Sequence, residues 1–128
     1  MRPLEITIDE SILQANYRAL CAWEPGTEPV PVIKSNGYGH GLIPTARAML
    51  AAGARRLAVF RVEEAATLRA AGVTCPVWLL LGTETGEEEE ALRLGGVTCA
   101  VHCLAPPIHL IQAGHEFQVF PNAQVFPE

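Results

Sequence analysis

The chain begins with an alternating pattern of apolar and polar side chains that then changes to helical spacing. Residues 4–8 alternate, which predicts a short strand with one buried face. Asp9 stands where a helix N-cap belongs, and apolar side chains recur at helical spacing over residues 10–22. This spacing predicts a helix. Proline and glycine residues between positions 25 and 29 end it.

From residue 30 onward, a unit of one strand and one helix repeats. Four apolar segments predict strands, at residues 30–33, 56–60, 76–81 and 98–102. The segments after them predict helices from about Pro44 to Gly53, Glu63 to Ala71, Glu87 to Gly95 and, as a short one, Pro107 to Gly114. Regular alternation of strands and helices predicts right-handed βαβ units in a parallel sheet. The pattern fits a doubly wound sheet and a barrel equally well.

Acidic residues mark the beginnings of two predicted helices. Glu63 and Glu64 open one helix, and a run of glutamates at 87–90 opens the next. Such a run can bind a cation, but first-turn carboxylates ordinarily complement the helix dipole and the unpaired backbone N–H groups. We therefore interpret these glutamates as helix-start residues.

The end of the chain departs from the repeat. The tetrapeptide Gln-Val-Phe-Pro occurs at 118–121 and again at 124–127. A short repeat with two prolines is typical of extended chain and not of another βα unit. We therefore assign residues 1–114 to one α/β unit and expect residues 115–128 to be an irregular tail.

The composition is that of an ordinary globular chain. The sequence has 128 residues, 49% hydrophobic and 18% charged, with a formal net charge of −5. No cluster of Lys and Arg offers a footprint for nucleic acid, and no apolar run approaches the roughly 20 residues of a membrane span. The N-terminus lacks a basic segment followed by an apolar stretch, so we expect a cytoplasmic protein. A complete (β/α)₈ barrel needs about 250 residues, more than this chain has.

The four cysteines give no strong sign of a disulfide or a metal site. They are Cys21, Cys75, Cys99 and Cys103, and thiols stay reduced in the cytosol. His102 lies between the last two, but a single Cys-x-x-x-Cys lacks the second pair of ligands of a closed zinc site. We interpret these cysteines as small apolar residues and predict no metal.

The segment after the first predicted repeat strand carries the candidate chemistry. Lys34 follows strand 30–33 directly, at the carboxyl end where parallel sheets place their active sites. A lysine leaving such a strand is partly desolvated, which favours the nucleophilic amine that forms Schiff bases. The glycines at 37–41 permit positive φ angles and close backbone approach, and Tyr38 adds a hydroxyl. Taken alone, the segment also fits a solvated lysine beside a common Gly-rich turn.

The wording of this segment resembles a known family. Residues 34–41, Lys-Ser-Asn-Gly-Tyr-Gly-His-Gly, resemble the pyridoxal 5′-phosphate (PLP) attachment motif of alanine racemases, usually Lys-Ala-Asn-(Ala/Gly)-Tyr-Gly-His-Gly. Further segments match the family in the same order: Glu5–Asp9, Asn16–Arg18, Ala52–Ala54, Ala58–Val59, Glu63–Ala65, Leu68–Val73 and Leu81–Gly82. The resemblance covers about residues 4 to 114.

The resemblance implies a PLP-dependent racemase that interconverts L- and D-alanine. The family's N-terminal domain is a (β/α)₈ barrel, of which this chain would hold roughly the first four βα units, and the active enzyme is a homodimer. The resemblance implies that Lys34 is the Schiff-base lysine and the acid/base for one face of the substrate Cα. It also implies that Tyr38 hydrogen-bonds the cofactor phosphate and that Leu81 lines the cofactor pocket. We expect Asn36 and His40 to fix the turn through side-chain-to-backbone bonds.

Two parts of the family's active site have no counterpart in this sequence. The opposing base is a tyrosine of the family's C-terminal domain, whereas the only tyrosines here are Tyr17 and Tyr38. The arginine that faces the pyridine nitrogen also lies beyond the matching region. We therefore expect the chain to be incomplete and inactive alone. A serine or broad-specificity racemase is an alternative, and so is a non-catalytic PLP-homeostasis protein, although that family lacks the Tyr-Gly-His-Gly continuation.

Overall fold

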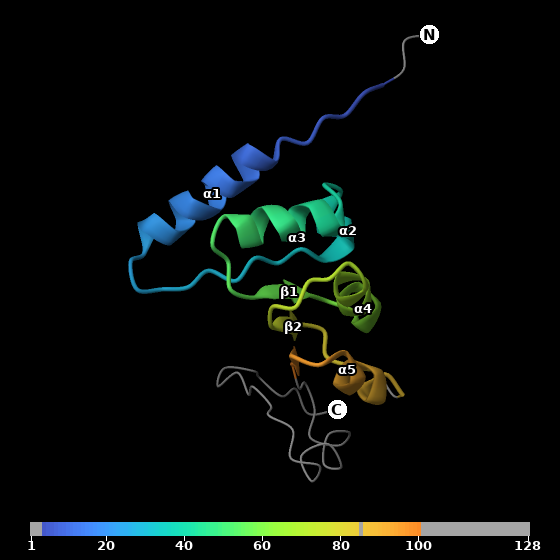
Figure 1. Cartoon of the computed structure of the whole chain (residues 1–128). Helices are drawn as coiled ribbons and strands as arrows, with labels where there is room; N and C mark the ends of the chain where they lie inside the picture. The colour runs from blue at the N-terminus through green and yellow to red at the C-terminus, as the bar shows by residue number, and fades with distance from the viewer. Residues whose placement is uncertain (1–3, 85, 101–128) are drawn as a thin grey trace, which may run out of the picture.

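The centre of the molecule is a sheet of three parallel strands, with helices packed beside it (Figure 1). The computed structural model describes residues 4–84 and 86–100. The elements in chain order are α1 (Glu10–Trp23), α2 (Lys34–Tyr38), α3 (Leu42–Ala51), β1 (Leu57–Val59), α4 (Val62–Ala70), β2 (Val77–Leu79), α5 (Glu88–Leu94) and β3 (Val97–Cys99). This order confirms the predicted alternation of strands and helices from β1 onward.

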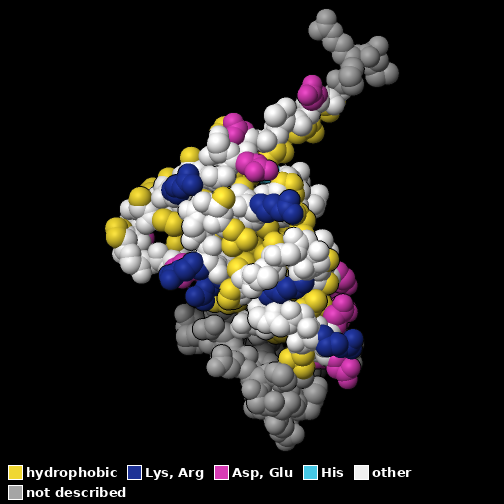
Figure 2. All heavy atoms as spheres, in the orientation of Figure 1, with side chains coloured by type: hydrophobic (Ala, Val, Ile, Leu, Met, Phe, Trp, Pro, Cys, Tyr) yellow, Lys and Arg dark blue, Asp and Glu magenta, His cyan; other side chains and the backbone are white. Residues whose placement is uncertain are grey.

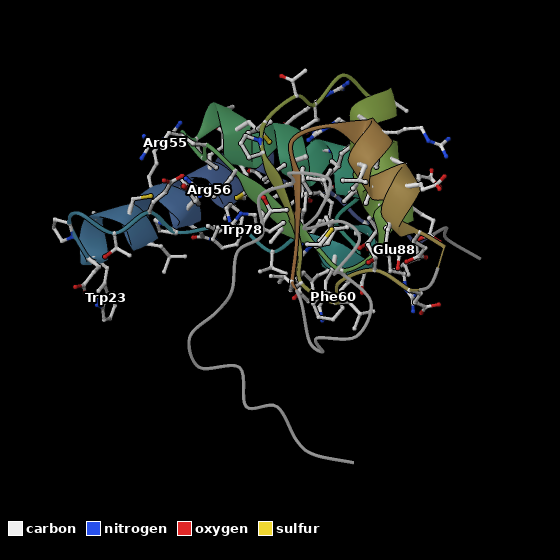
Figure 3. The ribbon with its side chains drawn as sticks, turned by 90° about the horizontal axis from the view of Figure 1, so that it is seen from below. Trp23, Arg55, Arg56, Phe60, Trp78 and Glu88 are labelled. Carbon is white, nitrogen blue, oxygen red and sulfur yellow. The ribbon has the colours of Figure 1, made fainter. Side chains whose placement is uncertain are left out.

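The sheet has the order β1-β2-β3, and each strand runs parallel to its neighbour. In register, Leu57 faces Val77, and Val77 faces Val97. Consecutive parallel strands connected by right-handed crossovers place their helices on one side. Figure 3 shows α4 and α5 together on one side of the strands, and α3 packs against α4. The predicted parallel α/β arrangement is therefore confirmed.

The first predicted strand of the repeat, at 30–33, is shorter than expected. Only Val32 forms a bridge to the sheet, parallel to Ala58 of β1. Two backbone hydrogen bonds accompany the bridge: the Ile33 N–H donates to Ala58 over 2.9 Å, and the Ala58 N–H donates to Pro31 over 2.9 Å. Because Pro29 and Pro31 have no N–H, they cannot extend this ladder. The described residues therefore hold three strands and one bridge rather than four full strands.

The predicted strand at residues 4–8 is wrong. Residues 4–9 belong to no helix or strand, and the side chains of Leu4 and Ile6 are 90% and 76% exposed. In Figure 1 this segment leads away from the rest of the chain. Alternation shows which side chains a strand could bury, but a strand also needs a neighbour to pair with, and none lies beside this segment among the described residues.

The helices α1, α3, α4 and α5 lie within two residues of their predicted bounds; α2 falls where the sequence predicted a Gly-rich turn. The Asp9 carboxylate caps α1 by accepting the Ser11 N–H over 2.9 Å, and hydrogen bonds from the side chain and backbone of Ser11 lower the pKa of Asp9. The helix α3 ends shortly before Gly53, which has a φ of +107°. No helix in the described ranges is long and apolar enough to cross a membrane. The predicted helix at 107–114 and the tail at 115–128 lie outside those ranges.

The core lies between the sheet and the helices α3 and α4. Its members share almost complete burial and come from the sheet, from α3 and α4, and from Ile33 at the end of the bridge: Ile33, Ala46, Leu57, Val59, Val62, Ala65, Leu68, Val77 and Leu79. By contrast, α1 packs on α3 and keeps large apolar side chains in solvent, with Leu20 59% and Trp23 84% exposed. Figure 2 shows exposed hydrophobic side chains in yellow along α1. The stability of the fold therefore depends mainly on the contacts around the sheet.

Leu79 and Leu20 provide a matched test of this core. Leu79 is fully buried in β2 and Leu20 is exposed on α1. We expect Leu79→Ala to lower the free energy of unfolding by about 2–5 kcal/mol, because it removes buried apolar contacts and leaves a cavity. Leu20→Ala should change it by less than about 1 kcal/mol. Urea unfolding followed by circular dichroism measures both, and equal losses would contradict the assignment of the core.

Candidate active site

Lys34 lies at the carboxyl edge of the sheet. The bridge between Val32 and Ala58 is parallel, and Lys34 comes two residues after it in the chain direction. Ile33, directly before Lys34, is only 2% exposed, so the backbone leaves the sheet from a buried position. Phe60 follows β1 at this same edge, and Leu81 lies two residues beyond β2. The predicted position of Lys34 is confirmed.

The chain leaves this edge through a left-handed turn. The short element α2 has φ angles of 53°, 55° and 62° at Ser35, Asn36 and Gly37, and Tyr38 has a φ of 54°. Residues other than glycine rarely adopt this region, because Cβ crowds the neighbouring carbonyl oxygen. The predicted positive φ angles of Gly37, Gly39 and Gly41 are confirmed, and Ser35, Asn36 and Tyr38 add three positive-φ residues that carry side chains.

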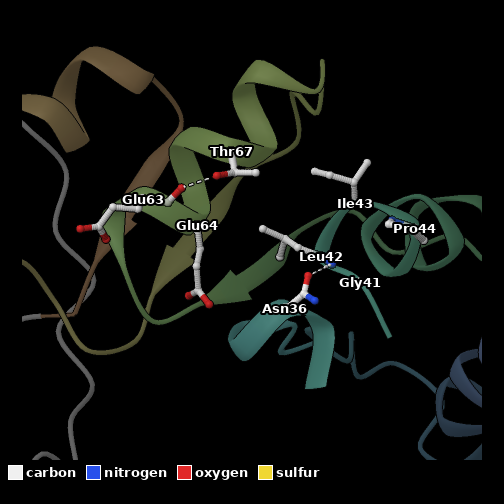
Figure 4. Close-up of a pocket in the computed structure, with 8 residues that line it drawn as sticks. All are labelled: Asn36, Gly41, Leu42, Ile43, Pro44, Glu63, Glu64 and Thr67. Atoms are coloured by element: carbon white, nitrogen blue, oxygen red, sulfur yellow. Dashed lines mark hydrogen bonds between the residues drawn. The ribbon is translucent and has the colours of Figure 1, made fainter. Parts of the chain in front are cut away.

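Side-chain hydrogen bonds hold the turn in place. The Asn36 Oδ1 accepts the N–H of Leu42, the first residue of α3, over 2.9 Å (Figure 4). The His40 ring lies with Nδ1 2.9 Å from the Gly37 carbonyl oxygen, so Nδ1 donates in the tautomer that carries a proton there. These contacts confirm the structural roles expected for Asn36 and His40.

Gly37 allows α3 to approach the turn closely. A Cβ atom at this position would lie 2.6 Å from Oγ1 of Thr45 in α3. Thr45 is itself buried, and its Oγ1 has no hydrogen-bond partner among the described residues. The absence of a side chain at Gly37 therefore sets the distance between the lysine-bearing turn and the helix that follows it.

The Lys34 amine lies over an aromatic ring. Its Nζ is 3.6 Å from the centroid of the Phe60 ring and 6.0 Å from that of Tyr38. A cation over a ring face is attracted by the ring quadrupole, so Phe60 holds the amine and covers it on one side. Phe60 is labelled in Figure 3, which views the molecule from below. Sequence reasoning missed Phe60, although its place directly after a strand was a usable signal.

The other two predicted site residues present exposed side chains. Tyr38 is 59% exposed, and its hydroxyl makes no hydrogen bond to a described residue; Leu81 is 45% exposed. A half-buried primary amine is the group that forms Schiff bases with carbonyl compounds, and the nearby phenol of Tyr38 has no hydrogen-bond partner among the described residues. The structure brings Lys34, Phe60 and Tyr38 together, whereas Leu81 shares only the edge of the sheet.

Glu64 joins the turn to the next helix. Its carboxylate accepts hydrogen bonds from the backbone N–H groups of Ser35, Phe60 and Arg61. It also borders an open pocket of about 430 Å³ between the start of α3 and the first turn of α4 (Figure 4). From the sequence we interpreted Glu64 only as a helix-start residue. Its bond to Ser35 connects segments that are distant in the chain, and a local pattern does not reveal such a contact.

The cysteines in the described part of the chain are free thiols. Cys21, Cys75 and Cys99 are partly buried, and burial raises the pKa of the Cys75 and Cys99 thiols. In the described ranges, no group of three or more His, Cys, Asp or Glu side chains is placed to bind a metal ion. The predicted non-metal role of His102 and Cys103 falls outside those ranges.

These features define a class of protein: a parallel α/β chain that carries one lysine at the carboxyl edge of its sheet, followed by a left-handed, Gly-rich turn. Residues 8–116 match the family model described as alanine racemase, N-terminal domain. The chain therefore belongs to the alanine racemase N-terminal domain family.

Individual relatives agree with this assignment. The chain is 48% identical over 77 residues to the alanine racemase of Mycobacterium avium, a match that covers 59% of this chain and 20% of that protein. Among solved structures, the biosynthetic alanine racemase of Pseudomonas aeruginosa has a TM-score of 0.78 at 31% identity, covering 93% of this chain and 34% of that one. The Bartonella henselae enzyme, solved with covalently bound pyridoxal phosphate, has a TM-score of 0.67 at 34% identity, covering 74% and 28%. The chain thus spans about a fifth to a third of the length of these relatives.

Asn36 and Ser35 allow a matched test of the turn. Both have left-handed φ angles, but only the Asn36 side chain bonds to α3. We expect Asn36→Ala to lower the free energy of unfolding by about 1–3 kcal/mol, because it removes a hydrogen bond and places alanine in a region that asparagine tolerates better. Ser35→Ala should stay within about 0.5 kcal/mol of the parent. Urea titration decides, and a neutral Asn36→Ala would refute the capping role.

Proposed function

We propose that this chain provides the PLP-linking half of an alanine racemase active site, with Lys34 as the residue that holds the cofactor. The observation that carries the proposal is the position of Lys34: a half-buried amine at the carboxyl edge of the sheet, inside the family's attachment motif. The covalently bound pyridoxal phosphate of the Bartonella henselae relative supports it. Lys34 is also the only lysine among the 128 residues, so no other side-chain amine competes for the role.

Each side chain at the edge has a distinct part in this proposal. Lys34 would hold PLP through Nζ and would move a proton at one face of the substrate Cα. Tyr38 would donate its hydroxyl to the cofactor phosphate, and Leu81 would contribute an apolar wall. Phe60 shields one side of the amine from water. When bound, PLP withdraws electrons from the substrate Cα.

The present conformation of Lys34 is compatible with this role. The amine lies on the Phe60 ring, and a lysine side chain has a flexible four-carbon stem. The Nζ can therefore leave the ring and reach a carbonyl by side-chain rotation, without a change in the backbone of the turn. The contact with Phe60 is a resting position for the amine and not a barrier.

The activity of the complete family extends the proposal beyond this chain. By family resemblance, we propose that the substrate is alanine, that the protein acts in D-alanine biosynthesis, and that it forms a homodimer in the cytoplasm. We propose no nucleic-acid or membrane partner. The residues that select alanine over serine lie, by the same resemblance, outside the matching region. Lys34 and Tyr38 would serve either substrate in the same way.

PLP labelling tests the proposed role of Lys34. Borohydride should fix PLP on Lys34 as a stable secondary amine, detected by peptide mass spectrometry. The α-amino group is the only other amine and serves as the internal reference. Lys34→Arg keeps the charge but cannot form the link, so labelling of its site should vanish. Equal labelling of Lys34 and the α-amino group would show that no specific site exists.

The 128-residue chain alone should not racemise alanine faster than free PLP. A positioned acid or base typically contributes about 10²–10⁴-fold, and neither Tyr17 nor Tyr38 is available as the opposing base. Tyr17 is buried, with its hydroxyl bonded to the Pro29 carbonyl. Exchange of the alanine Cα proton in D₂O, with chirality followed in parallel, measures the rate. Racemisation well above the PLP control that disappears in Lys34→Arg would disprove this prediction and require another base.

A further inference from the structure

The Glu64 carboxylate connects two segments that are distant in sequence. One oxygen, Oε1, accepts the Ser35 N–H over 2.7 Å. The other, Oε2, accepts the N–H groups of Phe60 and Arg61 over 2.9 and 3.1 Å. Each oxygen therefore serves a different segment: one serves the turn that carries Lys34, and the other serves the end of β1. Both oxygens must be acceptors for the two segments to be held together.

Helix capping explains only part of this arrangement. A glutamate in the first turn commonly accepts the N–H of the N-cap residue, which here is Arg61. The bond to Ser35 spans 29 positions and contributes nothing to the start of α4. It is also the shortest of the three. Figure 4 shows Glu64 extending from α4 toward the turn that bears Asn36, whereas Glu63 points away.

The two tethered segments are the ones that form the contact of the Lys34 amine. Ser35 follows Lys34 directly, and the Phe60 ring lies 3.6 Å from Nζ. Glu64 binds the backbone N–H groups of Ser35 and Phe60. It therefore holds the backbone next to Lys34 and the backbone that carries the Phe60 ring. The sheet supports this region only weakly, since a single bridge precedes Lys34.

We propose that Glu64 is the positioning residue of Lys34, holding the amine over the Phe60 ring through hydrogen bonds to both backbone segments. This proposal deepens the function proposed above and rests on it for its catalytic meaning. The geometric part concerns the chain by itself. Glu64 touches neither cofactor nor substrate in this scheme; it acts through the placement of Lys34.

The lysine signal in NMR spectra provides a direct readout. Because Lys34 is the only lysine, a chain labelled with ¹³C at the lysine Cε gives one ε-CH₂ resonance. In the parent, the ring current of Phe60 should shift this resonance upfield. Phe60→Leu should abolish the shift and provide the reference. In Glu64→Gln, the amide has one acceptor oxygen instead of two, so one segment is released and the resonance should move to the reference position.

Two further variants separate positioning from helix stability. Glu63→Gln changes the adjacent, exposed carboxylate, which makes no hydrogen bond through its side chain to a described residue, and it should leave the lysine resonance unchanged. Arg61→Ser combined with Glu64→Gln supplies a standard N-cap for α4 while still leaving only one side-chain acceptor for the two segments. This double variant should also lose the upfield shift. It decides the question if Glu64→Gln alone fails to fold.

The outcomes distinguish this proposal from the function it builds on. An upfield shift that persists in a folded Glu64→Gln or in the double variant overturns the positioning role, whether or not PLP labels Lys34. An unshifted resonance in the parent overturns it as well. Loss of the shift in both Glu64 variants, with the shift kept in Glu63→Gln, supports positioning even if PLP fails to bind. In that case the proposed function fails and the geometric proposal stands.

Discussion

The left-handed turn between Ile33 and α3 is the constraint on which the candidate site depends. Ser35, Asn36 and Tyr38 all have positive φ angles, each at a cost of about 1–2 kcal/mol for a residue with a side chain. Such a turn persists only where surrounding contacts offset that cost. The burial of Ile33 and the hydrogen bonds of Asn36 and Glu64 supply these contacts. The direction in which Lys34 leaves the sheet follows from them.

The weak strand before the turn explains why side chains carry so much of this task. A long parallel ladder would fix Lys34 through the backbone alone, but the prolines before it limit the ladder to one bridge at Val32. The turn is therefore anchored from two helices that follow it. Asn36 ties it to the start of α3, and Glu64 ties it to the start of α4.

Sequence patterns anticipated the features that depend on local spacing. The alternation of strands and helices, the cap at Asp9 and the position of Lys34 all follow from residues close together in the chain. The failures share a different origin. The alternation at residues 4–8 predicts a strand, but no partner strand lies beside it among the described residues. The segment at 30–33 has the apolar character of a strand, but its proline lacks the N–H donor that a longer ladder needs.

The contacts of Phe60 with Lys34 and of Glu64 with Ser35 could not be predicted from sequence patterns, for a related reason. Each joins residues that are 26 to 29 positions apart, and no periodicity reports such a meeting. The motif at 34–41 indicated the chemistry of the segment but not the left-handed conformation of Ser35 and Asn36. That conformation depends on partners in α3 and α4, which a short motif does not contain.

The site combines a firmly held backbone with a loosely held amine. Hydrogen bonds to Ser35 and Leu42 fix the turn at both ends, whereas the amine itself is held by a contact to the Phe60 ring worth about 0.5–2 kcal/mol. Energy of that size keeps Nζ over the ring in the resting chain, yet it yields to any stronger bond. In the function proposed above, Lys34 first holds a cofactor and is then free to move a proton, which requires a fixed backbone and a mobile amine. Its backbone must not drift, because a displacement of about 1 Å can cost 10²-fold in rate. Its amine must change partners. The rigidity comes from Asn36 and Glu64, and the mobility from the four-carbon stem of Lys34.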